Sequence, residues 1–310
     1  MKWEKKGLIY SPRKNHDWNQ KYAILPTPVY IESSNVIRIF FGTTDNQNYG
    51  RISYLDVCAD NPSEVLYEHD SYILDLGEPG TFDDCGVVPS CIIKEGQDNC
   101  FNLYTVGFQR TVKTPYMLFA GLAQSQDLSN FQRYCQAPIL PRSCSRHISQ
   151  GAPCVIYEDG IYKMWHWFAT KWIEVDGKPF MDYHIGYAES LDAKSWEMRD
   201  TACLSPMAER GEFAVARPWV FKMNNKYHMY YSTRYKEKLY RIDYAVSEDG
   251  IEWERVDTPP FDVSEHGWDS EMICYPSIIE ANGKTFMFYN GNNNGETGFG
   301  YAELFEEVSK

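Results

Sequence analysis

Hydrophobic and polar positions alternate in short runs along this chain, and the runs recur several times in the same order. The clearest set begins with an apolar run after a proline at residues 217–221 and continues with aromatic runs at 227–231 and 240–246. It ends in a turn at 247–250 and in Trp253, which begins a fourth run. Alternation with a period of two is typical of half-buried strands, so this set predicts four antiparallel strands.

The same unit recurs along the chain, and a proline marks its first strand each time. The marker prolines are Pro28, Pro89, Pro153, Pro218 and Pro276. Subtraction gives spacings of about 58 to 65 residues, and a regular spacing indicates an array of repeated units. We therefore predict an all-β fold, a five-bladed β-propeller with four antiparallel strands per blade, as a single domain spanning residues 1–310.

Four further segments add to this prediction. A propeller closes its ring by completing the last blade with a terminal strand, so we expect residues 8–10 and 301–305 to share a blade. Residues 107–116 and 169–179 lengthen the link between the second and third strands of their blades. Such loops either overhang a pocket or form plain β-hairpins.

The repeated Ser-x-Asp ends of the third strands have a different expected role. Ser247 and Asp249 belong to one of them, and the pattern recurs in several blades with an aromatic residue soon after. Recurrence away from the propeller axis favours a device that closes a turn.

Charge and composition exclude several kinds of partner. The formal charge of −13, without runs of Lys and Arg, disfavours nucleic acid and anionic membranes. No apolar stretch approaches the roughly 20 residues that span a bilayer, and the first residues carry no secretory pattern, so we expect a cytoplasmic protein. The nine cysteines form no zinc-binding pattern and are expected to be buried thiols. We predict no metal site and no cofactor.

Acidic side chains lie a few residues before several marker prolines. They are Asp83 and Asp84, Glu212, and Asp269 with Glu271. In a propeller these connectors reach one common face, so the acids are expected to converge on a pocket. Cleavage of a glycosidic bond needs two carboxyl groups, and crowding raises the pKa of one of them. The alternative for any single acid is that it caps a turn.

Basic, aromatic and amide side chains accompany these acids. Arg217 directly precedes its marker proline, as Tyr275 does in the last blade, while Arg234 and Arg241 flank the hairpin between the second and third strands. A guanidinium group suits carboxylate, phosphate or vicinal hydroxyls, although a salt bridge from Arg217 to a neighbouring acid such as Glu212 is the alternative.

Three further residues complete the predicted pocket. His147 lies before the third marker proline, Trp268 lies outside the regular strands, and Asn290 directly follows an inner strand. A flat indole face suits the apolar face of a sugar ring, but such a residue also packs between blades. Asn290 could instead belong to a tight hairpin turn.

Together these motifs resemble the five-bladed propeller glycosidases around glycoside hydrolase families 43, 32 and 130. The resemblance lies in the blade endings Ala-x-Ser-x-Asp-Gly-x-x-Trp and in the aromatic strands. Residues 80–86, 268–272 and 289–292 look like a bacterial branch described as glycosidase-like and associated with surface-polysaccharide gene clusters. The resemblance implies a propeller and an activity on carbohydrate.

The catalytic pattern of family 43 does not carry over residue by residue. Those enzymes place a base Asp on the first blade, a pKa-tuning Asp on the second and an acid Glu on the third. Here the first blade offers only Asp17 and the third offers Arg146 and His147, and no Asp stands immediately before any marker proline.

The sequence therefore leaves two hypotheses. The first is a glycoside hydrolase-like enzyme that cleaves or transfers a glycosidic bond, with Glu212 as proton donor and Asp84 or Asp269 as base or pKa tuner. Its substrate would be a carbohydrate or an activated sugar, and the arginines suit an anionic group on it. The second is a non-catalytic sugar-binding or polysaccharide-biosynthesis module on a degenerate glycosidase scaffold.

The predicted substrate contacts of the first hypothesis form a larger set. They are Asp83, His147, Arg217, Arg234, Arg241, Trp268, Glu271, Tyr275 and Asn290.

Overall fold

The computed structural model describes residues 2–96 and 100–305, and its regular structure is almost entirely β-strand. In this part of the chain the helical segments are two 3-10 turns, η1 (Glu32–Ser34) and η2 (Ala208–Arg210), and the four-residue turn α1 (Asn292–Gly295). The predicted all-β class is confirmed. None of the described helices is long and apolar enough to cross a membrane.

The strands pair in antiparallel groups that follow the chain. In chain order the groups are β2 (Lys21–Ile31), β3 (Val36–Thr44), β4 (Gly50–Cys58) and β5 (Val65–Glu68); β6 (Gly86–Glu95), β7 (Cys100–Gln109), β8 (Met117–Ser125) and β9 (Gln132–Arg133); β10 (Ser149–Glu158), β11 (Ile161–Ala169), β14 (His184–Ser190) and β15 (Glu197–Met198); β16 (Glu212–Met223), β17 (Lys226–Tyr235), β18 (Arg241–Ser247) and β19 (Glu254–Val256); and β20 (Cys274–Ala281), β21 (Lys284–Asn290), β22 (Phe299–Phe305) and β1 (Lys2–Tyr10). A separate hairpin is formed by β12 (Trp172–Val175) and β13 (Lys178–Met181).

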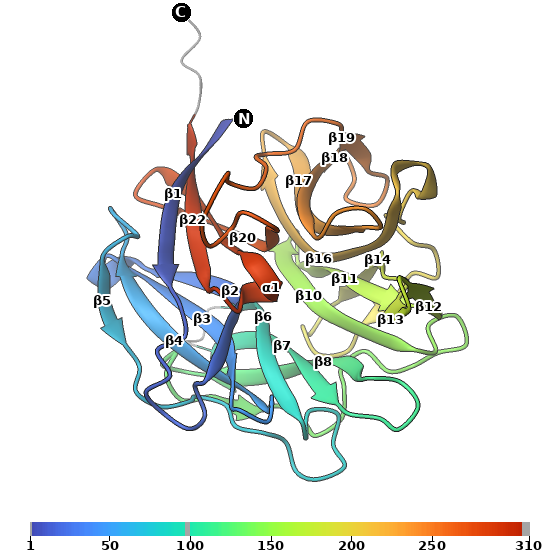
Figure 1. Ribbon diagram of the computed structural model, residues 1–310, viewed down its shortest axis with the longest axis horizontal. Coiled ribbons are helices and arrows are strands. Elements are labelled where there is room, and N and C mark those ends of the chain that lie inside the picture. The colour runs from blue at the N-terminus through green and yellow to red at the C-terminus, as the bar shows by residue number, and fades with distance from the viewer. Residues whose placement is uncertain (1, 97–99, 306–310) are drawn as a thin grey trace, which may run out of the picture.

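These groups surround a common centre. Strands β2, β6, β10, β16 and β20, each the first of its group after a connector, lie nearest the middle of the view in Figure 1. Neighbouring groups touch through single parallel contacts, Gly50 with Gly86 and Gln150 with Phe119, which join three of them into one sheet of 12 strands. The propeller-like arrangement places connectors from distant parts of the chain beside one another.

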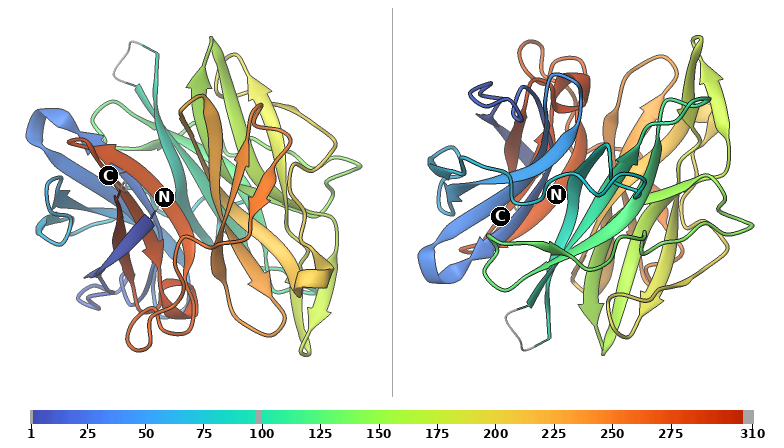
Figure 2. Two further views of the ribbon diagram at one scale, coloured as in Figure 1. Left: turned by 90° about the horizontal axis from the view of Figure 1, so that it is seen from above. Right: turned by 90° about the horizontal axis from the view of Figure 1, so that it is seen from below.

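The first and last strands lie in one sheet. β1 pairs antiparallel with β22 from Lys2 opposite Phe305 to Tyr10 opposite Phe299, and Figures 1 and 2 show the two strands side by side. Trp3 Nε1 also donates a 2.9 Å hydrogen bond to Tyr230 Oη in the preceding group. The prediction that these two segments share a sheet is confirmed.

The Ser-x-Asp motifs close turns after the third strands. Asp249 Oδ1 accepts hydrogen bonds from the backbone N–H groups of Ile251 and Glu252, and Ser247 Oγ donates to the same oxygen. Gly250 has φ of 78°, and a Cβ there would come within 2.8 Å of the Trp165 ring. Asp127 and Asp192 make the equivalent backbone contacts, so the expected structural role is confirmed.

Candidate functional site

A β-bulge interrupts each inner strand close to its marker proline. The strand register shifts between Ile24 and Thr27, Pro89 and Cys91, Gly151 and Cys154, Ala216 and Trp219, and Cys274 and Ser277. At four of these bulges a non-glycine residue has a left-handed backbone, namely Leu25, Ala152, Arg217 and Tyr275, with φ between 48° and 57°. A bulge redirects a side chain, and strain of this kind gathers at functional sites.

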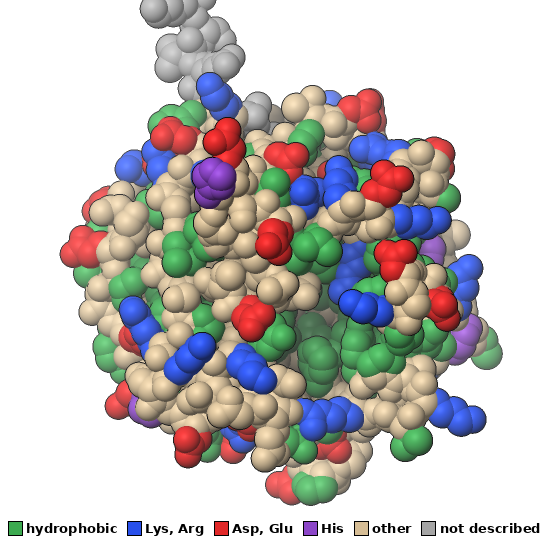
Figure 3. Space-filling view, viewed as in Figure 1, with side chains coloured by type: hydrophobic (Ala, Val, Ile, Leu, Met, Phe, Trp, Pro, Cys, Tyr) green, Lys and Arg blue, Asp and Glu red, His purple; other side chains and the backbone are tan. Residues whose placement is uncertain are grey.

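The strained residues face a central pocket of about 390 Å³. All four of them line it together with Val88 of β6, so every inner strand contributes to its wall. Figure 3 shows the hollow near the middle of this face, with hydrophobic side chains inside and Lys and Arg around it. The rest of the lining is Tyr22, Ile24, Thr44, Asn48, Gly50, Cys85, Gly86, Val106, Phe108, Tyr116, Leu118, Trp167, Tyr183, Ala216, Arg234, Tyr240 and Asn294.

Arg217 is a buried cation at the wall of this pocket. Its residue exposure is 1%, and its Nη2 donates a 3.4 Å hydrogen bond to Thr27 Oγ1. Its Nε and Nη1 have no hydrogen-bond partner among the described residues, and its guanidinium carbon lies 5.2 Å from the centre of the Trp219 ring. Burial lowers the pKa of Arg217 to about 10, so it remains charged at neutral pH without a carboxylate beside it.

Arg234 provides a second guanidinium group. Its Cζ lies 4.9 Å from the centre of the Phe180 ring and 4.6 Å from that of Tyr240, so the group is held between two aromatic faces. Its Nη1 is buried and has no hydrogen-bond partner in the described part of the chain.

Phenol groups lie around the two arginines. Burial raises the pKa of Tyr183 and of Tyr275, and raises that of Tyr240 to about 12 against the opposing effect of Arg234. These phenols therefore stay protonated at neutral pH. Tyr275 Oη donates to Asn294 Oδ1 at 3.3 Å.

The lining of the central pocket suits an anionic ligand with a sugar-like body. Two guanidinium groups supply unused donors for a carboxylate or phosphate, and burying such donors without partners costs free energy. Trp167 and the phenol rings offer flat faces for the apolar side of a sugar ring. Among the described residues that line this pocket there is no Asp or Glu.

Glu212 lies outside this lining and is held by other side chains. Both of its carboxylate oxygens accept from Arg255 Nη1, at 2.9 and 2.7 Å, and Arg210 Nε lies 3.2 Å from Oε1. The backbone N–H of Met207 donates to Oε2, and the side chain is fully buried. The buried carboxylate thus ties β16 to β19 and to η2. It does not pair with Arg217.

The other predicted acids also make contacts outside the pocket. Asp269 Oδ2 accepts from Lys5 Nζ at 2.9 Å and from Tyr289 Oη at 3.0 Å. Asp84 Oδ2 accepts from the Gly80 backbone N–H, and Asp83 pairs with Arg133 at 2.7 Å. Glu271 contributes its backbone to the contacts of Asn292 and Arg241.

Among these acids, Asp84 is the closest in sequence to a residue that lines the central pocket. The next residue, Cys85, is part of the lining. The structure therefore brings Arg217, Arg234 and Tyr275 together at one pocket, and places Asp84, Glu212 and Asp269 outside its lining.

None of the remaining predicted contacts lines the central pocket. Asn290 is buried and accepts from the Leu25 backbone N–H at 2.8 Å while it donates to Ala23 and Gly298, so it supports the strained pocket wall. Arg241 pairs with Asp262 at 2.7 Å.

Trp268 and His147 also lie outside the pocket lining. Trp268 packs against Tyr289 and over Gly300, where a Cβ would come within 2.5 Å of its ring. His147 is exposed.

Several lining residues have no place in the sequence prediction. Leu25, Ala152, Tyr183 and Tyr240 are ordinary core residue types by pattern, and only their position near a marker proline or a strand end sets them apart. The insertions gave a better signal, because Phe108 and Tyr116 of the first one line the central pocket. Among the described residues no group of three His, Cys, Asp or Glu could hold a metal ion.

The second insertion is both a hairpin and a pocket wall. It forms β12 and β13, and its Val175, Asp176 and Lys178 line a second pocket that adjoins the first. The two expectations for this loop, a plain hairpin and an overhang, are thus met together.

Comparison with known sequences identifies relatives of this chain. It is 34% identical over 305 residues to the uncharacterised protein Rv1502 of Mycobacterium tuberculosis, covering 98% of this chain and 99% of that protein. A stretch of 105 residues is 33% identical to a β-1,2-mannobiose phosphorylase of Thermoanaerobacter, covering 28% of this chain and 34% of that enzyme. No protein-family profile matches the chain.

Solved structures with a similar fold include glycoside hydrolases. One is a structure from glycoside hydrolase family 130, a family of mannoside phosphorylases that contains hydrolases targeting β-1,2 mannosidic linkages in Candida mannan. It superposes with a TM-score of 0.73 at 13% identity, covering 97% of this chain and 93% of that chain. A thermostable family 43 hydrolase superposes with a TM-score of 0.67 at 17% identity, covering 95% and 93%. At these low identities, the TM-scores show a shared fold and nothing more.

Proposed function

Because the chain belongs to the same family as the mycobacterial protein Rv1502 and has the fold of the propeller glycoside hydrolases, we propose that it is a carbohydrate-active protein of the glycosidase type. Its ligand is a sugar beside an oxyanion, bound in the central pocket. The observation that carries this proposal is the buried guanidinium group of Arg217, whose Nε and Nη1 have no partner in the described chain.

The proposal includes a definite architecture. We take the five antiparallel groups to be five blades of four strands in a single domain, residues 1–310, with the central pocket on the propeller axis. Support comes from the pocket wall, to which β2, β6, β10, β16 and β20 each contribute a residue. The sugar would then contact segments from all five groups.

The oxyanion has two chemical sources, an acidic group on the sugar or a phosphate beside it. The mannobiose phosphorylase relative makes inorganic phosphate a reasonable second source. Calorimetric titration of the protein with galacturonic acid, with galactose, and with inorganic phosphate in the presence and absence of galactose separates the two. We expect one anionic ligand to bind at least tenfold more tightly than galactose alone. If neither anionic ligand binds more tightly than galactose alone, the proposal is wrong.

In the enzymatic form of this proposal, the protein cleaves or transfers a glycosidic bond. This form keeps Glu212 as proton donor and Asp84 or Asp269 as base or pKa tuner, and it requires Glu212 to leave the ion pairs with Arg255 and Arg210 that hold it outside the central pocket. The second candidate is a sugar-binding module without turnover, and the absence of Asp and Glu from the described lining of the central pocket favours it.

Turnover of a panel of aryl glycosides and nucleotide sugars distinguishes these two forms. The enzymatic form predicts that the wild-type protein turns over at least one substrate. The Glu212→Gln variant should lose this turnover and still bind sugar in the central pocket. The module predicts binding without turnover in either protein. A folded Glu212→Gln variant that retains full turnover would remove Glu212 from the mechanism, so circular dichroism of each variant is the necessary control.

A further inference from the structure

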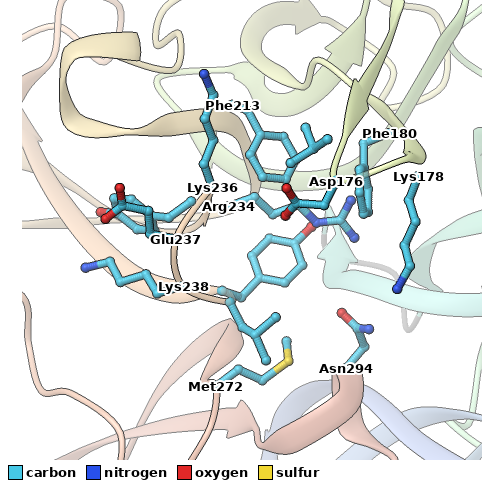
Figure 4. A pocket seen from close by; sticks show the side chains of 14 residues that line it. Asp176, Lys178, Phe180, Phe213, Arg234, Lys236, Glu237, Lys238, Met272 and Asn294 are labelled. Atoms are coloured by element: carbon cyan, nitrogen blue, oxygen red, sulfur yellow. The ribbon is translucent and has the colours of Figure 1, made fainter.

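A second pocket adjoins the central one and has its own chemistry. It has a volume of about 370 Å³ and shares Arg234, Tyr240 and Asn294 with the central pocket. Its walls are the β12–β13 hairpin on one side and residues 235–239, the end of β17 and the loop after it, on the other. Phe213 and Met272 complete the lining. Figure 4 shows Arg234 in the middle of this outer pocket.

The outer pocket carries an excess of positive charge on a protein of net charge −13. Lys178, Lys236 and Lys238 line it together with Arg234, against two carboxylates, Asp176 and Glu237. Figure 4 shows the three lysines spread around Arg234. A concave surface with an excess of one sign of charge concentrates the electric field. These lysines therefore attract an anion more strongly than isolated surface lysines do.

The shared residues identify the junction of the two pockets. Arg234 faces both, and its buried Nη1 has no partner among the described residues. Each pocket alone is near the lower end of the roughly 300 to 1,000 Å³ that is typical of small-molecule sites. A ligand longer than one sugar unit would fill both pockets, with the bond between its units beside Arg234.

We propose that the ligand is an acidic oligosaccharide of at least two units, whose second unit occupies the outer pocket, where the surrounding Lys178, Lys236 and Lys238 attract its acidic group. This inference rests on the proposed function, because it takes the central pocket to be the site of the first unit. It assigns the outer pocket to length and charge selection, and Arg234 to the junction between the two units.

A chain-length series tests the inference. Galacturonic acid and its di- and trisaccharides are titrated into the wild-type protein and into a triple variant, Lys178→Gln, Lys236→Gln and Lys238→Gln. We expect the wild-type protein to bind the disaccharide at least tenfold more tightly than the monosaccharide. The triple variant should lose that gain and keep its affinity for the monosaccharide. The methyl ester of the disaccharide, which lacks the charge, should bind the wild-type protein no more tightly than it binds the triple variant.

A matched control separates local charge from total charge. Lys2→Gln, Lys14→Gln and Lys94→Gln together remove three exposed cations that line neither pocket, and this variant should retain the gain for the disaccharide. Equal affinities of the wild-type protein for one and two units, or an unchanged gain in the Lys178, Lys236 and Lys238 variant, would overturn the inference. If the monosaccharide still binds tightly in either of these cases, the proposed function stands. If no member of the series binds, both the proposed function in its acidic-sugar form and the further inference are contradicted.

Discussion

Arg217 occupies a position that an arginine rarely adopts in a folded protein. Its backbone is left-handed, with φ of 51°, its side chain is buried, and no described carboxylate pairs with it. A left-handed non-glycine residue costs about 1–3 kcal/mol, and an unsatisfied buried polar group costs a similar amount. A residue that destabilises the fold in this way is better explained by ligand binding than by packing.

Arg217→Met removes the charge and keeps most of the side-chain volume. We predict that the free energy of unfolding rises by roughly 1–3 kcal/mol, because a buried cation without full partners is removed. The affinity for an anionic sugar should fall about 10- to 100-fold, since hydrogen bonds to charged groups contribute about 1.5–3 kcal/mol. Urea unfolding and calorimetric titration measure the two effects.

Arg38→Met is the matched control. Arg38 pairs with Asp56 at 2.8 Å and lines neither pocket. This variant should lose stability and retain sugar affinity. If Arg217→Met destabilised the fold and left sugar binding unchanged, Arg217 would be a structural residue.

At the residue scale, the predicted residues Arg217, Arg234 and Tyr275 line the central pocket, and the predicted acids do not. Arg217 and Tyr275 were found because they directly precede a marker proline, where the bulge turns the side chain toward the pocket. Glu212 lies farther back on the same strand, beyond the bulge. Position along a strand does not show which way a side chain points once a bulge has shifted the register.

At the element scale, the Ser-x-Asp turns end the third strand in three of the strand groups. In one of them the Asp192 carboxylate accepts hydrogen bonds from the Ser195 and Lys194 backbone N–H groups. The Ser195 contact, ahead of the other contributions, lowers the pKa of Asp192 from 3.8 to about 2. A carboxylate with a lowered pKa in the folded state adds stability above its unfolded pKa, and this stability is lost as the pH falls through the folded value.

Asp192→Asn should therefore destabilise the protein at neutral pH and have less effect in acid. We expect a loss of about 1 kcal/mol or less at pH 7, because the residue is exposed. The difference from the wild-type protein should shrink between pH 4 and pH 2. Urea unfolding at several pH values measures it, with Asp70→Asn, an exposed acid elsewhere, as the control. A difference that grew on acidification would contradict the role of the carboxylate.

Elements were predicted from period and spacing, and their function only in part. The insertion at residues 169–179 stood out by its length, and it provides a wall of the outer pocket. The loop at 235–239 gave no such signal, because it is short and its charges are of the kind found on any exposed turn. Its importance comes from the hairpin opposite, which belongs to another strand group.

For the whole molecule, the pairing of the first and last strands depends on β1. This strand covers β22, and Trp3 and Tyr10 donate hydrogen bonds to Tyr230 and Glu68 in two other groups. Recurring prolines and terminal alternation were enough to predict this pairing, because closure is the simplest way to hide the edge of the last sheet. The contacts of individual side chains across groups were beyond what a repeat pattern can give.

A chain that begins at Ser11 would expose the edge of β22. We predict a large fall in the melting temperature and self-association, because unpaired strand edges bind other chains. Thermal unfolding and size-exclusion chromatography measure both effects, and a synthetic peptide of residues 1–12 should restore part of the stability. A truncated protein that stays monomeric with an unchanged melting temperature would show that β1 does not protect the edge of β22.

The central claim is that segments far apart in the sequence form one anionic-sugar site around Arg217. The most direct measurement is a crystal structure of the protein with a galacturonic acid disaccharide. The account predicts one carboxylate within about 3 Å of the Arg217 guanidinium nitrogens, with its sugar ring against the aromatic wall of the central pocket. A sugar bound elsewhere on the protein, or one whose carboxylate points away from Arg217, would contradict it.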